Sequence, residues 1–108
     1  MTTTYDLQLL ADEHLARAEG SAHGRSAHLL LSEPPLRQSV IALTAGHALD
    51  EHSRPVAATL QVLRGTVRLT AAAGDVTLVA GQLLAIPPER HGLTAVTDAA
   101  VLLTAVTA

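Results

Sequence analysis

The sequence predicts an all-β domain, an antiparallel sandwich or barrel, preceded by one short helix. From residue 27 onward, short runs rich in Val, Leu, Thr and Ala alternate with turns that contain Gly, Pro or Asp. The chain has 108 residues and is 48% hydrophobic, which suits one domain with one core. Because Tyr5 is the only aromatic residue, aliphatic side chains must fill that core.

The helix is predicted from Asp6 to Glu19, since apolar residues recur there at helical spacing. These residues are Leu7, Leu10, Ala11, His14, Leu15 and Ala18. Asp6 is suited to cap the start of the helix, and Gly20 to end it. A Gly- and Ser-containing loop follows. We therefore divide the chain into an N-terminal helix and linker, residues 1–26, and a barrel, residues 27–108.

Eight strands are predicted between the turn signals. They are Ala27–Leu31, Gln38–Ala45, Ala57–Leu63, Thr66–Ala71, Val76–Val79, Leu83–Ile86, Gly92–Val96 and Val101–Val106. In Thr66–Ala71, apolar and polar residues alternate, so one side can face a core while Arg68 faces water. The run Leu60–Leu63 is almost continuously apolar, which predicts a strand covered on both faces.

Composition excludes several classes of function. The net charge is −3 and the seven basic residues form no stripe, so we expect no nucleic-acid partner. Without cysteine there are no disulfides and no thiolate ligands. The N-terminus lacks the basic and apolar regions of a signal peptide, and no uncharged apolar run reaches the roughly 20 residues that span a bilayer. We expect a cytoplasmic protein with no membrane partner.

Two spaced motifs carry the chemistry of the chain. In the first, Gly46 is followed by five residues and His52, and Gly65 stands at a tight hairpin further on. In the second, Gly81 is followed by five residues and Pro87, and His91 comes four residues later. This layout resembles the two motifs of the cupin family over roughly residues 27–106. The resemblance implies a double-stranded β-helix, a barrel of the jelly-roll type.

The resemblance also implies a metal site, although only two of its four customary ligands are present. His52 occupies the first histidine position and His91 the histidine of the second motif. Arg54 stands at the second histidine position and Ala58 at the glutamate position. Divalent Zn, Mn, Fe or Ni needs three or four nitrogen or oxygen donors. We therefore expect any such ion to be held weakly by His52 and His91.

Other residues offer alternatives to this ligand pair. His47 is a candidate third imidazole, although it lies five residues before His52 near a turn. Asp50 or Glu51 is a candidate carboxylate ligand, and both are expected in a solvent-facing loop. The remaining histidines, His14, His23 and His28, are interpreted as surface or packing residues.

Several functions fit this set of residues. One is a cupin that binds a divalent metal ion or a small molecule through His52 and His91. A second is a metal-free cupin in which Arg54 binds a small anion by charge-assisted hydrogen bonds. A third is a metal-independent isomerase or dehydratase, with a histidine as general base and Arg54 as electrophile. The fourth is a structural module with idle histidines.

The resemblance further implies a homodimer formed by sheet-to-sheet packing. The aliphatic faces of Gln38–Ala45 and Val101–Val106 are the predicted contact surface. An exposed apolar strand needs cover, which is the reason for choosing them.

Overall fold

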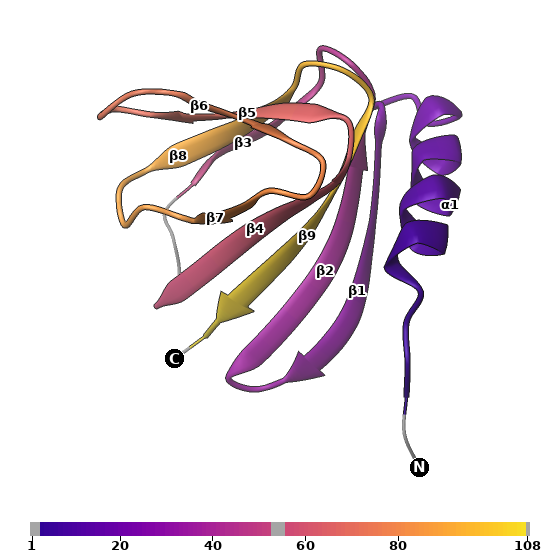
Figure 1. Ribbon diagram of the computed structural model, residues 1–108, viewed down its shortest axis with the longest axis horizontal. Helices are drawn as coiled ribbons and strands as arrows, with labels where there is room; N and C mark the ends of the chain where they lie inside the picture. The colour runs from indigo at the N-terminus through magenta and orange to yellow at the C-terminus, as the bar shows by residue number, and fades with distance from the viewer. Residues whose placement is uncertain (1–2, 53–55, 108) are drawn as a thin grey trace.

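A computed structural model describes residues 3–52 and 56–107 of the chain. Within these residues one helix precedes nine strands (Figure 1). The elements are α1 (Leu7–Glu19), β1 (Arg25–Glu33), β2 (Leu36–Leu43), β3 (Ala48–His52), β4 (Ala57–Arg64), β5 (Thr66–Ala71), β6 (Val76–Val79), β7 (Leu83–Ala85), β8 (His91–Ala95) and β9 (Ala99–Val106). The described helix is too short to cross a membrane.

The strands form two antiparallel sheets. The larger sheet has the order β1-β2-β9-β4-β7, and the smaller one has the order β3-β8-β5-β6. Sequence neighbours pair in the hairpins β1–β2 and β5–β6, whereas β9 returns from the end of the chain to lie between β2 and β4. In Figure 1 the smaller sheet lies across the larger one, and α1 stands beside β1 and β2. The fold is the predicted all-β class with one N-terminal helix.

The main core lies between the two sheets and is aliphatic throughout. Strand alternation builds it, because successive side chains of a strand point to opposite faces. On β4 and β9, the register partners Val62 and Val101 face the smaller sheet and are almost completely buried. From the smaller sheet, Val67 and Leu93 meet them. This core supports the sheet positions on which the candidate site depends.

A second, smaller core lies between α1 and the outer face of the larger sheet. It joins Ala11 and Ala18 of the helix to Val40, Ala42 and Ala100 of β2 and β9. The predicted helical face is therefore the buried one. The run Leu60–Leu63 is covered on both sides as expected, since Leu60 belongs to the main core and Leu63 to the second.

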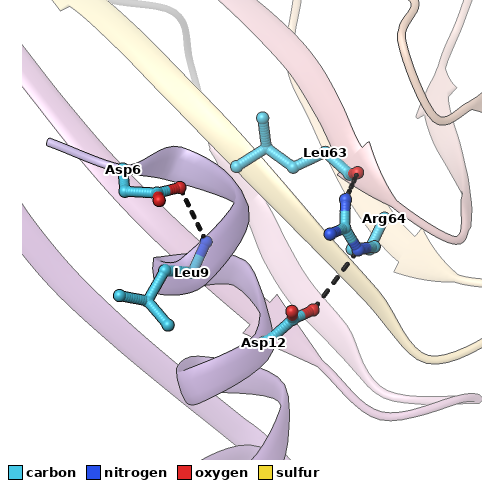
Figure 2. A network of polar contacts seen from close by, with 5 residues as sticks. All are labelled: Asp6, Leu9, Asp12, Leu63 and Arg64. Carbon is cyan, nitrogen blue, oxygen red and sulfur yellow. Dashed lines mark hydrogen bonds and ion pairs between the residues drawn. The ribbon is translucent and has the colours of Figure 1, made fainter.

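Polar contacts fix the start of α1 and its attachment to the sheet (Figure 2). The backbone N–H of Leu9 donates to the Asp6 carboxylate at 3.0 Å, which makes Asp6 the N-cap as predicted. Asp12 pairs with Nε of Arg64 at 3.3 Å, and Arg64 also donates to the Leu63 carbonyl at 3.0 Å. These contacts connect the middle of the helix to the end of β4.

One expectation from the sequence needs correction. Residues Ala48–His52, expected to contain a loop, form strand β3, so Asp50 is an exposed strand residue instead of a loop residue. Helix α1 covers part of the outer face of Gln38–Ala45 and Val101–Val106, because Val40 and Ala42 are buried against it and Leu102 packs against the same cluster. The homodimer and its contact surface stay predictions.

Candidate functional site

His91 is the centre of the candidate site. It opens β8, the second strand of the smaller sheet, with His52 of β3 and Ala71 of β5 as its register partners. Its side chain is only 3% exposed. Its Nδ1 lies 3.0 Å from the backbone carbonyl of Glu89, two residues earlier. Since a carbonyl only accepts, Nδ1 is the donor in this hydrogen bond.

A pocket of about 230 Å³ opens beside His91. Its other lining residues are Arg37, Ser39, Ala58, Ile86, Leu103, Ala105 and Thr107. Three of the strands that form it belong to the larger sheet, where Arg37, Ala105 and Ala58 are register partners across β2, β9 and β4. The pocket continues inward past His91, Ile86 and Leu103 into a small aliphatic recess. The arrangement is a cup with aliphatic walls and a few polar groups near its mouth.

The strand register places His52 opposite His91. This pairing depends on an irregularity in β3. Leu49 pairs with Leu93 and His52 pairs with His91, so three steps along β3 match two steps along β8. In an unbroken ladder Glu51, not His52, would be the partner of His91. A bulge of this kind is common beside functional sites because it changes which residue is presented.

His47 is not brought to this position. It precedes β3, and its carbonyl accepts from the N–H of Ala95, four residues beyond His91 on β8. At about 3.3 Å per residue, that places the two backbones roughly 13 Å apart. The exposed ring of His47 instead lies with Nδ1 2.8 Å from the Thr44 hydroxyl. His47 therefore belongs to the turn at the other end of the strand.

The predicted anion ligand, Arg54, lies outside the described residues. The cation that lines the pocket among the residues described is Arg37, which sequence analysis missed. A signal for it exists, because Arg37, Ser39, Ile41 and Leu43 alternate along β2 and so share one face. Which face that is depends on pairing with β9, a strand more than 60 residues away in the sequence.

Ala58, which stands at the glutamate position of the first motif, also lies at the pocket. Ala58 is 8% exposed and lines the same pocket as His91. A methyl group thus stands where the cupin resemblance places a carboxylate. Among the side chains that the structure describes, those of residues 3–50 and 56–107, no three His, Asp or Glu gather in a group that could hold a metal ion.

The remaining histidines lie away from the pocket. His14 of α1 is 3% exposed, with Nδ1 2.7 Å from the Ser26 hydroxyl and its ring 5.4 Å from that of His28. Burial is the main cause that lowers the pKa of His14, and the positive charge of Arg17 lowers it further. His14 is therefore a packing residue, as the sequence indicated. His23 is exposed in the loop after the helix.

Comparison with known proteins decides the fold family. Neither a protein-family model nor a curated protein sequence matches this chain. Solved structures do match. A cupin superfamily protein from Desulfitobacterium hafniense superposes with a TM-score of 0.73 at 15% identity, over 78% of each chain. This chain has a cupin fold.

Two further structures show how widely this cupin architecture is shared. A conserved protein of unknown function from Streptococcus pyogenes superposes with a TM-score of 0.74 at 25% identity, over 82% of this chain and 78% of the other. A salicylate 1,2-dioxygenase from Pseudaminobacter salicylatoxidans has a TM-score of 0.76 at 19% identity. That match covers 91% of this chain but 33% of the dioxygenase. The cupin resemblance drawn from the spaced glycines and histidines is thus confirmed for the fold.

Proposed function

We propose that this cupin binds a small molecule in the cup beside His91. The observation that carries the proposal is a polar ring, 3% exposed, that lines a pocket with mainly aliphatic walls. Ligand sites in proteins combine an apolar cavity with a few fixed polar groups. The Glu89 carbonyl orients the His91 ring, so its position is set before a ligand arrives.

A weakly held divalent metal ion is the second candidate. Two observations favour it: the pairing of His52 with His91 in the strand register, and the hydrogen bond from His91 Nδ1 to a carbonyl. Metal-binding histidines commonly donate their other ring N–H in this way. When bound, such an ion would act as a Lewis acid toward an oxygen of the ligand.

The residues fit a metal ion only in part. Imidazole nitrogens suit Zn, Ni and Fe, but a firm site needs a third protein ligand. Ala58 supplies none at the position where cupins place a carboxylate, and the described residues offer no group of three. The binding proposal therefore does not depend on a metal ion.

The first experiment is an NMR screen of small soluble fragments against protein made without a histidine tag. We expect binders to shift the backbone amides of Ile86 and Leu103, which line the pocket. The variant His91→Gln should weaken those shifts. The matched control is His47→Gln, an exposed histidine at the other end of β3. If no fragment shifts the amide resonances of Ile86 and Leu103, the proposal is contradicted.

Elemental analysis of the same tag-free protein tests the metal candidate. After incubation with Zn²⁺ and brief desalting, a two-histidine site should retain less than one equivalent, and His91→Gln should retain none. Equal retention by the parent protein, His91→Gln and His47→Gln would place the metal elsewhere and remove this candidate.

A further inference from the structure

The inward face of β2 changes from charged to aliphatic along its length. Arg37, Ser39, Ile41 and Leu43 share this face, and the last two pack into the main core. Each step of two residues advances about 6.6 Å along the strand. A guanidinium thus stands at the mouth of the cup, a hydroxyl one step inside, and hydrocarbon beyond.

The small neighbours of Arg37 leave room beside it. Its register partner on β9 is Ala105, which in turn pairs with Ala58 on β4. The methyl groups of Ala58 and Ala105 line the pocket together with Arg37 and His91. Larger side chains at Ala58 and Ala105 would fill the space that the pocket occupies.

Among the described residues that line the pocket, charge has one sign. Arg37 is the charged side chain among the described lining residues, and no described carboxylate lines the pocket with it. No described carboxylate forms a salt bridge with Arg37, and Asp12 pairs with Arg64 instead. Ser39 and Thr107 add hydroxyl groups to the lining. The pocket therefore combines a cation, hydrogen-bond donors and an aliphatic interior.

We infer that the cup selects small aliphatic monocarboxylates, with Arg37 binding the carboxylate at the mouth and the hydrocarbon tail lying inward toward Leu103 and Ile86. This inference rests on the proposed binding function and names its ligand class. At about 30 Å³ for each water-sized group, a volume of about 230 Å³ holds roughly eight non-hydrogen atoms. Pentanoate, with seven, is a suitable probe.

A carboxylate suits this pocket better than a phosphate ester does. The planar guanidinium can hold one carboxylate through two parallel hydrogen bonds. A phosphate dianion calls for further cations or a set of backbone N–H groups. The described lining supplies one guanidinium and mainly hydrocarbon, so a monoanion with an apolar tail matches it.

The experiment is an NMR titration with pentanoate, pentanamide and butyl phosphate, which carry the same four-carbon tail and differ in the charge of the head group. We expect pentanoate to bind more tightly than the other two. Arg37→Gln should weaken pentanoate binding about 10- to 100-fold, the range expected for loss of a hydrogen bond to a charged group. The same variant should leave pentanamide binding nearly unchanged. Arg37→Lys should recover part of the affinity, because it restores the positive charge but not the planar group that makes two parallel hydrogen bonds.

Arg68→Gln is the matched control, since it removes the same charge from an exposed position on β5. It should change none of the three affinities. Fold loss is not a concern at Arg37, whose side chain is exposed.

Other results of the titration would separate the carboxylate inference from the binding function. If pentanamide binds as tightly as pentanoate and Arg37→Gln has no effect, the carboxylate inference is wrong while the binding function stands. Tighter binding of butyl phosphate overturns the ligand class alone. If none of the three probes shifts the pocket amides, the inference is overturned, and the fragment screen then decides the fate of the binding function separately.

Discussion

Gly65, the glycine that ends the first cupin motif, is expected to tolerate no side chain. It joins β4 to β5 with φ of +74°, a left-handed conformation that glycine adopts far more readily than other residues. A Cβ built at this position would collide with the carbonyl oxygen of Asp98 and lie 2.9 Å from the Thr97 hydroxyl. Both steric and conformational costs therefore oppose Gly65→Ala.

Relieving this collision would cost considerable free energy, because hydrogen bonds hold Asp98 and Thr97 in place. The Asp98 carboxylate accepts from the N–H of Ala45 at 2.8 Å, and the Thr97 hydroxyl accepts from the N–H of Thr66 at 3.0 Å. Moving the Asp98 carbonyl would disturb both hydrogen bonds and the entry to β9, the central strand of the larger sheet.

Gly46 provides the matched control for the size of the effect. It also has a positive φ, +84°, but a Cβ there meets nothing within 4 Å. Gly46→Ala should therefore cost about 1 kcal/mol for the left-handed backbone alone. Gly65→Ala adds about 1–3 kcal/mol for overpacking and about 1 kcal/mol for each hydrogen bond lost. With both hydrogen bonds lost, the expected total is about 4–6 kcal/mol.

Urea denaturation followed by circular dichroism measures the difference between the two variants. An asparagine at each position sharpens the test, because Asn tolerates a left-handed backbone but carries a Cβ. Asn should therefore be nearly harmless at position 46 and as damaging as Ala at position 65. If Gly65→Ala and Gly46→Ala differ by less than about 1 kcal/mol, the steric explanation is refuted.

Three further predictions concern metal binding, pH and the helix. Ala58→Glu restores the carboxylate position of the motif, so it should lower stability without metal. Its melting temperature should rise more with Zn²⁺ than that of the parent, as measured by scanning calorimetry, and equal rises would contradict this. Because the pKa of His14 is lowered in the fold, the unfolded chain binds more protons, and stability should decline as pH falls below the usual histidine pKa of about 6.5. Denaturation at pH 5 and pH 7.5 should show a smaller decline for His14→Gln than for the control His23→Gln. Asp12→Ala should lower the free energy of unfolding by less than about 1 kcal/mol, since its ion pair with Arg64 is well exposed; a larger loss in urea denaturation would show that the contact anchors α1.

Much of the fold follows from local sequence signals. Hydrophobic periodicity and the Asp6 cap gave the helix to within one residue, and strands β5 and β6 match their predicted ranges. These features depend on neighbours in the sequence. The spacing of Gly46, Gly65 and Gly81 likewise records turns, and all three have positive φ angles.

The candidate site was predictable only in part. The spaced motifs singled out residues 52 and 91, which the strand register brings opposite each other. They could not show the bulge in β3, which makes His52 instead of Glu51 the partner of His91. Strand β3 itself was missed because Asp50, Glu51 and His52 interrupt the apolar alternation that marks a strand.

The sequence by itself determined an aliphatic all-β domain, its helix, and the histidines worth examining, because periodicity, capping and turn chemistry act over a few residues. Only the tertiary structure decided that Arg37 lines the cup, that His47 lies at the far end of its strand, and that α1 covers part of the outer face of the larger sheet. These facts depend on the register between distant strands, where a shift of one residue would turn every side chain to the opposite face.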